Sequence, residues 1–198
     1  MKAKNQTETI SAADLLKMAT EKRDAGNIFA AIDLLRKAYA EIGNDFVSYP
    51  VSTFLRLPLY LQQAGHNEEA WREFNLLLTR GFQKQFKNPE LLPMEHYQIY
   101  DKMRLFLQRE KKFDLAVHFG ILSYISWAIG LFHQNRVDEL KGYIEDENIE
   151  SNIIPLLKKA KKLNLKDELV AVVVAEIKLL PNVDFANLTN HVDAVIFR

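Results

Sequence analysis

The residue types that could do chemistry are few in this chain and lie far apart. Cysteine is absent, which excludes thiol nucleophiles, cysteine-bound zinc and disulfides. The five histidines are His66, His96, His118, His133 and His191, and the closest two are 15 residues apart (118 to 133), too far for a helical pair of metal ligands. None of the seven glycines belongs to a GxxxxGK phosphate loop or a GxSxG nucleophile elbow. The sequence therefore predicts no catalytic motif, no metal and no cofactor.

The charged runs have a structural explanation. The acidic run Glu145 to Glu147 precedes a predicted helix that begins at Ser151, and the basic run Lys158 to Lys162 ends it. Acid at the start and base at the end of a helix suit its dipole. Lysine plus arginine equals aspartate plus glutamate, 26 each, and a formal net charge of zero argues against a binder of duplex nucleic acid. A nucleic-acid patch at these lysines is the minor alternative.

Composition then indicates the elements that must position any site. The chain has 198 residues with 7 glycines and 6 prolines, and few helix breakers favour an all-α fold. Residues 1–10 read as a polar N-terminal tail without a secretory signal, and the apolar stretch 115–132 is interrupted by His118 and two glycines. We expect a cytoplasmic protein without a membrane span. On a buried helix, His118 would be a satisfied core side chain.

Three segments of the chain align on their turns. The turn residues Gly26, Gly65 and Lys111 are each followed five residues later by an alanine, at offsets of 39 (26 to 65) and 46 (65 to 111). Apolar residues recur at helical intervals before and after each turn, so each segment predicts two packed helices. Self-similarity of this kind indicates stacked helical units. A glycine can adopt the positive φ that ends a helix, so the turn at Lys111 is expected to be less tight.

These segments resemble tetratricopeptide repeats, whose pattern is W-x2-L-G-x2-Y, then A-x3-F, then P. The residues that match are Leu15-x2-Met18-Ala19 with Ala31-x3-Leu35, Phe54-x2-Leu57 with Ala70-x3-Phe74, and Tyr100-x2-Met103 with Ala116-x3-Gly120. The resemblance covers roughly residues 11 to 125. It implies a right-handed superhelix of antiparallel helical hairpins, with three repeats in residues 11–134 and a C-terminal helical extension packed on them in residues 135–198.

That extension reads as a degenerate fourth hairpin and a cap. The helix from Ser151 would be followed by a turn at Asn164 and Leu165, then by a second helix over 166–180, with a last amphipathic helix at 185–197 over the end of the stack. Residues 172–174 are three valines that could alternatively form a strand. Pro58 lies inside a helix predicted over 52–64, and we expect a kink there rather than a later helix start.

The resemblance places function on the concave groove formed by the first helix of each hairpin. By matching positions, the groove would be lined by Leu16, Thr20, Arg23, Leu55, Arg56, Leu59, Gln62, Asp101, Leu105 and Gln108. The family's carboxylate clamp would fall on Leu16, Thr20, Arg56, Gln98 and Lys102. Only Lys102 keeps the right charge, so recognition of a chaperone's C-terminal carboxylate is not expected.

Three hypotheses about function follow. The leading one is a non-catalytic protein-interaction module that binds a peptide or a partner helix in this groove. The second is a self-associating structural protein, a homodimer formed through Trp127, Phe132 and the C-terminal hairpin. The third is a small-ligand sensor or enzyme on a helical solenoid, with a polar cluster of Tyr60, Arg56, Asp101 and Arg104.

Overall fold

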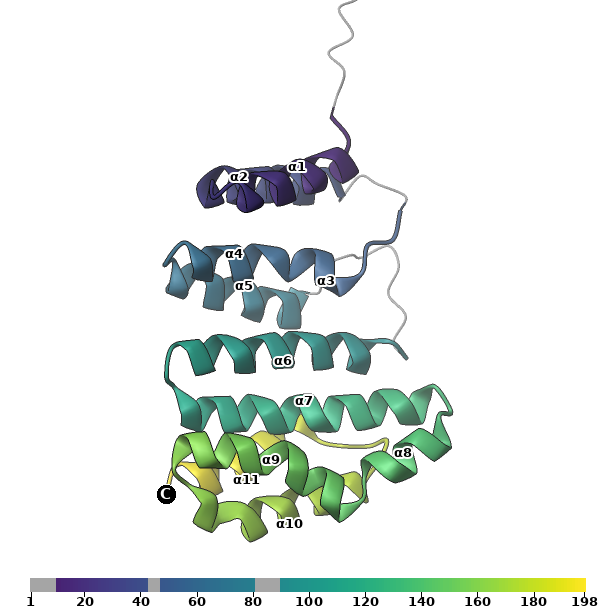
Figure 1. Cartoon of the computed structure of the whole chain (residues 1–198). Coiled ribbons are helices and arrows are strands. Elements are labelled where there is room, and N and C mark those ends of the chain that lie inside the picture. Colours follow the sequence, from purple (N-terminus) through teal and green to yellow (C-terminus); the bar gives the residue numbers. More distant parts are fainter. Residues whose placement is uncertain (1–9, 43–46, 81–89) are drawn as a thin grey trace, which may run out of the picture. The chain divides into compact units, whose positions relative to one another are not determined.

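A computed structural model describes residues 10–42, 47–80 and 90–198 of the chain. The regular structure in these ranges is helical, without a strand, so the all-α prediction is confirmed (Figure 1). Residues 1–9 of the expected polar tail lie outside the described residues. The chain divides into two compact units, Met1–Lys84 and Gln85–Arg198, which we call unit 1 and unit 2 and describe separately.

Unit 1 consists of two helix pairs and one short helix. In chain order the helices are α1 (Ala12–Asp24), α2 (Ile28–Ile42), α3 (Val51–Phe54), α4 (Arg56–Gln63) and α5 (Asn67–Arg80). Ser11 caps α1, because its hydroxyl accepts the backbone N–H of Asp14 at 3.1 Å. The alanines Ala31 and Ala70, predicted where two helices approach closely, are fully buried. Leu35, Leu61 and Phe74 fill the core beside them.

The expected kink at Pro58 is wrong. The helix is instead interrupted at Leu55, which ends α3 and precedes α4. Pro58 then lies in the first turn of α4, where a helix has no use for the missing backbone N–H. Two short helices therefore take the place of one kinked helix.

Within the described ranges, one hydrogen-bond pattern ends five helices. At each position the residue adopts a positive φ and donates its N–H three residues back, and the next residue donates five residues back. These residues are Gly26, Gly65, Lys111, Asn135 and Lys161, with φ between 53° and 81°. The turn at Lys111 is therefore as tight as those at the glycines, and our expectation of a looser turn was wrong.

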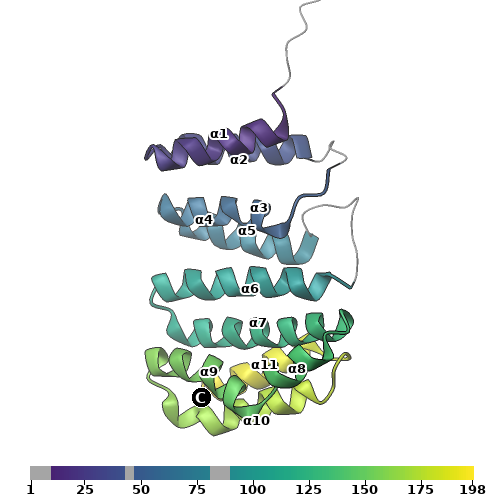
Figure 2. The same ribbon diagram turned by 45° about the vertical axis from the view of Figure 1, so that its right-hand side comes forward.

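Unit 2 is arranged around one long apolar helix. Its helices are α6 (Leu92–Arg109), α7 (Phe113–His133), α8 (Val137–Tyr143), α9 (Asp146–Ala160), α10 (Lys166–Ile177) and α11 (Phe185–Ile196), with a 3-10 turn η2 (Leu163–Leu165) before α10. In two views, α9, α10 and α11 lie on the side of α7 opposite to α6 (Figure 1 and Figure 2). By length and composition α7 is apolar enough to cross a membrane, but 72% of that stretch is buried inside the structure.

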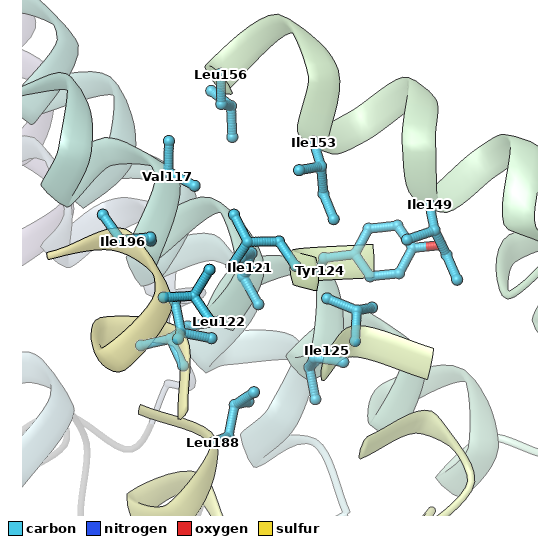
Figure 3. Packing of buried hydrophobic residues seen from close by; sticks show 14 of the residues in the cluster. Val117, Ile121, Leu122, Tyr124, Ile125, Ile149, Ile153, Leu156, Leu188 and Ile196 are labelled. Carbon is cyan, nitrogen blue, oxygen red and sulfur yellow. The ribbon is translucent and has the colours of Figure 1, made fainter. Parts of the chain in front are cut away.

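The core of unit 2 forms where α9 and α11 cover α7 (Figure 3). Ile121 and Ile125 of α7 are fully buried between Ile149 of α9 and Leu188 of α11. Burial of one such side chain contributes roughly 1.5–3 kcal/mol. This packing explains why α7 is apolar on almost all sides.

Three of the C-terminal helices, α9, α10 and α11, were predicted, although not with every boundary, whereas the short helix α8 was not predicted. Helix α9 begins at Asp146 rather than Ser151, because the acidic run forms its first turn, where negative charge is favourable. Residues 172–174 lie in α10, so the alternative strand is wrong. The expected helix at 185–197 is α11, and His118 is a satisfied core side chain as predicted, 7% exposed with its Nδ1 2.6 Å from Asp193 Oδ1 of α11.

Candidate functional site: a notch between three helices of unit 2

The expected groove residues of unit 1 are largely used to hold that unit together. Leu16 of α1 and Leu55 are 8% and 3% exposed. The Arg56 Nη2 atom donates to the Leu16 backbone oxygen at 2.8 Å and to the Thr20 hydroxyl at 2.7 Å. Arg56 thus joins α4 to α1 and fills the space between them.

The remaining groove candidates of unit 1 lie around the same contact. The guanidinium of Arg23 lies 5.3 Å from the centre of the Tyr60 ring and also bonds Asp24. Leu59 and Gln62 of α4 are half-buried. These groove candidates of unit 1 are therefore partly buried or already have a partner.

A notch of about 460 Å³ opens in unit 2 between α6, α7 and α9. This volume falls in the range of about 300–1,000 Å³ that is typical of ligand sites. We call it the α6–α9 notch. It is lined by Tyr97, Asp101, Arg104 and Gln108 of α6, by Gly120, Ser123, Tyr124 and Trp127 of α7, by Tyr143 of α8, and by Ser151, Asn152, Pro155, Leu156 and Lys159 of α9.

The base of the notch depends on Gly120. A Cβ atom there would lie 2.4 Å from Leu156 Cδ1 and 3.3 Å from Arg104 Cδ. The missing side chain lets α9 approach α7 at Leu156, while the shorter side chains Ser151 and Asn152 leave the space beside it open. In a helix interior glycine destabilises the helix by about 1 kcal/mol relative to alanine. At position 120 the glycine allows the close contact with Leu156 of α9.

One wall of the notch is charged. Arg104 donates through Nε at 3.2 Å and through Nη2 to the same carboxylate oxygen of Asp101, and Lys102 Nζ lies 3.0 Å from the other oxygen. Burial alone would raise the pKa of Asp101, but these hydrogen bonds and charges outweigh it and hold the pKa below its usual value. Asp101 is therefore ionised at neutral pH and fixes the Arg104 side chain.

Gln108 and Lys159 meet at the end of the notch. The Lys159 ammonium donates to Gln108 Oε1 at 2.9 Å. The Gln108 Nε2 atom is buried and has no hydrogen-bond partner within the described structure. A buried donor without a partner costs about 1–3 kcal/mol, so an added acceptor at this position would stabilise the complex that contains it.

A second part of the lining is aromatic. The rings of Tyr97 and Trp127 are 4.7 Å apart, and those of Tyr124 and Tyr143 are stacked at 4.3 Å with an angle of 17°. The Tyr124 hydroxyl donates to the Tyr143 carbonyl, and burial raises the pKa of both tyrosines. The phenols of Tyr124 and Tyr143 are thus neutral at neutral pH.

The sequence identified part of this site. Of the expected groove residues, Asp101 and Gln108 line the notch and Leu105 does not. Of the four residues expected to form one polar cluster, Asp101 and Arg104 are hydrogen-bonded to each other in unit 2, whereas Tyr60 and Arg56 belong to unit 1.

The contributions of α7 and α9 were missed. Trp127, assigned to a dimer interface, lies in the notch, while Phe132 is 41% exposed elsewhere on α7. The available signal was Gly120 at the position that the other two aligned segments fill with Leu35 and Phe74, together with Pro155 inside the predicted helix that became α9.

The hydroxyl groups of the lining are bonded to backbone carbonyls. The notch contains no histidine among its lining residues, and its two serines, Ser123 and Ser151, donate to the carbonyls of Tyr97 at 3.3 Å and Asn148 at 2.8 Å. Among the described residues, no group of three or more histidine, aspartate or glutamate side chains could hold a metal ion. What the notch presents is aromatic surface, amide groups and two fixed cations.

The comparisons with known proteins do not assign this site. No family model, no curated protein and no solved structure matches the chain. Function is therefore inferred from the geometry of the notch.

Proposed function

We propose that this protein is a non-catalytic interaction module that binds a peptide segment of a partner protein in the α6–α9 notch. The observation that supports it is the notch itself, a cavity of about 460 Å³ with an aromatic wall and a charged wall. We further propose that the units are stacked hairpins of the tetratricopeptide-like type in a right-handed superhelix, which would make the notch part of a concave surface. The repeated turns and the buried alanines support this.

The two walls suit two parts of a peptide. A flat apolar or aromatic side chain would pack on Tyr97 and Trp127, an arrangement of rings worth about 0.5–1.5 kcal/mol beyond its buried area. Peptide carbonyls would accept from Arg104, from Lys159 and from the unpaired Nε2 of Gln108. Since Arg104 is held by Asp101, little side-chain freedom is lost on binding.

The test is a selection of displayed random peptides on the wild-type protein, followed by binding measurements on two variants. Asn152→Arg places a long side chain in the mouth of the notch from an exposed position of α9. Ala171→Arg adds the same charge at an exposed position of α10, away from the notch. Selected peptides should bind the wild type with about micromolar affinity.

Asn152→Arg should weaken these peptides about tenfold or more, a change of about 1.4 kcal/mol, while Ala171→Arg leaves them unaffected. Equal binding to both variants, or no enrichment of any peptide, would remove this proposal. Circular dichroism of both variants checks that the helices remain.

A further inference from the structure

Lysines gather at one end of unit 2, where α6 and α9 end and α7 begins. Lys111 and Lys112 lie in the turn before α7, and Lys158, Lys159 and Lys161 lie at the end of α9. All five are exposed. In a chain with a formal net charge of zero, this is a local concentration of positive charge.

Four of these lysines, all but Lys158, line a hollow. A cavity of about 510 Å³ is lined by residues 111–115 from the start of α7, by residues 159–161 from the end of α9, and by Phe197. We call it the basic hollow. Leu115 and Phe197 are 36% and 51% exposed there, so the hollow also offers apolar surface. Its acidic residue, Asp114, is 3.4 Å from Lys162.

The lysines of the hollow are not neutralised by the protein. Within the described ranges, Lys111, Lys112 and Lys161 form no ion pair, whereas Lys162 nearby is engaged by Asp114 and by the Ile196 carbonyl. Lys159 contacts only the neutral amide of Gln108 among its described partners. An anionic ligand would thus find several uncompensated charges close together.

Two of the lysines occupy backbone positions that favour glycine. Lys111 and Lys161 both have a φ of 59°, a conformation that costs about 1–2 kcal/mol for a residue with a side chain. Unit 1 places Gly26 and Gly65 at the corresponding points. Lysine is thus present at both strained positions that line the hollow.

The basic hollow and the α6–α9 notch are adjacent. Lys159 lines both, and Gln108, its hydrogen-bond partner, lies at the end of the notch nearest to it. Building on the function proposed above, we propose that the bound segment is acidic at one end. Its apolar or aromatic part occupies the notch, and its aspartate or glutamate side chains pass over Lys159 into the basic hollow.

The shape of the site favours a peptide over other anions. A bilayer surface is flat and cannot enter a hollow of about 510 Å³, and a neutral protein has weak attraction for duplex nucleic acid. A peptide can place one acidic side chain in the hollow and pack its stem against Leu115 or Phe197. The neighbouring aromatic notch then receives the rest of the same segment.

The experiment uses the displayed peptides selected on the wild type and one multiple variant of the full chain. Lys111→Asn, Lys112→Gln and Lys161→Asn together remove three charges, and asparagine tolerates positive φ, as Asn135 does at the equivalent turn. The matched control replaces the exposed Lys17, Lys22 and Lys37 of unit 1 by glutamine. Anionic vesicles rich in phosphatidylserine and a single-stranded RNA are titrated as additional probes.

We expect the selected peptides to carry acidic residues on one side of an apolar segment. Removing the three lysines of the hollow should weaken these peptides about tenfold at low salt, while the unit 1 control changes binding less than about twofold. Replacing the acidic residues of a peptide by amides should produce the same loss on the wild type and no further loss on the lysine variant.

Selected peptides without acidic residues, or equal behaviour of both lysine variants, would overturn this inference. If Asn152→Arg still abolished binding in that case, the proposed function would stand without it. Binding of the vesicles or the RNA with the same dependence on the three lysines, and no such dependence for peptides, would also overturn it.

Discussion

The two units differ in what lies between their packed helices. In unit 1, the space between α1 and α4 is filled by Arg56, which donates two hydrogen bonds across it. In unit 2, the space beside α7 is bounded by Gly120 and by the short side chains of α9, and a notch of about 460 Å³ remains. The proposed recognition surface of unit 2 therefore lies where short side chains of α9 leave space beside α7.

The turns show a second difference between the units. Both units end their helices with the same hydrogen bonds, but unit 1 uses glycine and unit 2 uses lysine or asparagine. Glycine relieves backbone strain, while lysine at this position keeps a charge at the surface. The turns of unit 1 therefore avoid backbone strain, whereas the turns of unit 2 accept that strain and keep a polar side chain.

The largest expected effect is the loss of stability when a charge is placed in the core of unit 1. Leu55→Arg places a charge at a position 3% exposed in the core of unit 1, whereas Asn152→Arg changes an exposed residue of unit 2. Leu55→Arg should cost several kcal/mol and unfold unit 1, while Asn152→Arg should change the free energy of unfolding by less than about 0.5 kcal/mol.

The two tryptophans allow each unit to be followed by itself. Trp71 lies in α5 and Trp127 in α7, so a background with Trp127→Phe reports on unit 1 and one with Trp71→Phe reports on unit 2. Urea unfolding followed by fluorescence measures the change. A folded unit 1 in Leu55→Arg would show that this side chain lies on an open surface after all.

Loss of the bridge in unit 1 should have a smaller effect. Arg56→Met keeps most of the side-chain volume but removes two hydrogen bonds, one to the Thr20 hydroxyl and one to the Leu16 carbonyl, which still accepts from that hydroxyl at 3.2 Å. We expect a loss of about 1–3 kcal/mol in the unfolding of unit 1. Arg72→Met, at an exposed position of α5, is the control and should be nearly neutral. Equal stability of the two variants would contradict a bridging role.

The charged wall of the notch should give a dependence on pH. The pKa of Asp101 in the folded state lies below its ordinary value of 3.8, so the ionised carboxylate stabilises unit 2 above pH 3.8. This contribution is lost as the pH falls through the lowered pKa. Asp101→Asn should therefore cost about 1 kcal/mol at neutral pH and become neutral in strong acid. A cost that stays constant with pH would contradict the ion pair.

The smallest expected effect compares the turns. Lys111→Gly should stabilise unit 2 by about 0.5–1 kcal/mol, because glycine accepts a φ of 59° without strain. Gly26→Ala should destabilise unit 1 by about 1 kcal/mol, because its φ is 79°. Thermal unfolding measures both, and a loss of stability in Lys111→Gly would show that the lysine side chain stabilises its turn.

The spacing of residues within each segment was enough to predict most of the helices. The offsets of Gly26, Gly65 and the alanines after them predicted the helix pairs, because a tight turn and a close helix contact each demand a small residue. The tightness of the turn at Lys111 could not be predicted, since its left-handed backbone depends on the packing of α6 against α7 and not on the residue's own preference.

The site depended more on tertiary packing. Spacing placed Asp101 and Gln108 on one face of α6, and both line the notch. Leu55 was assigned to a groove because the break between α3 and α4, which changes the direction of its side chain, has no clear local signal. The contribution of α9 followed from the contact between Gly120 and Leu156, two residues far apart in the sequence.

The most direct test of a peptide site in the α6–α9 notch is a nuclear magnetic resonance titration of the labelled protein with a selected peptide. If the peptide binds in the notch, the largest amide shifts should fall on α6, α7 and α9, around Tyr97, Ser123 and Asn152. The Asn152→Arg variant should show none of them at the same peptide concentration. Shifts confined to α1 and α4, or spread evenly over both units, would contradict a peptide site in the notch.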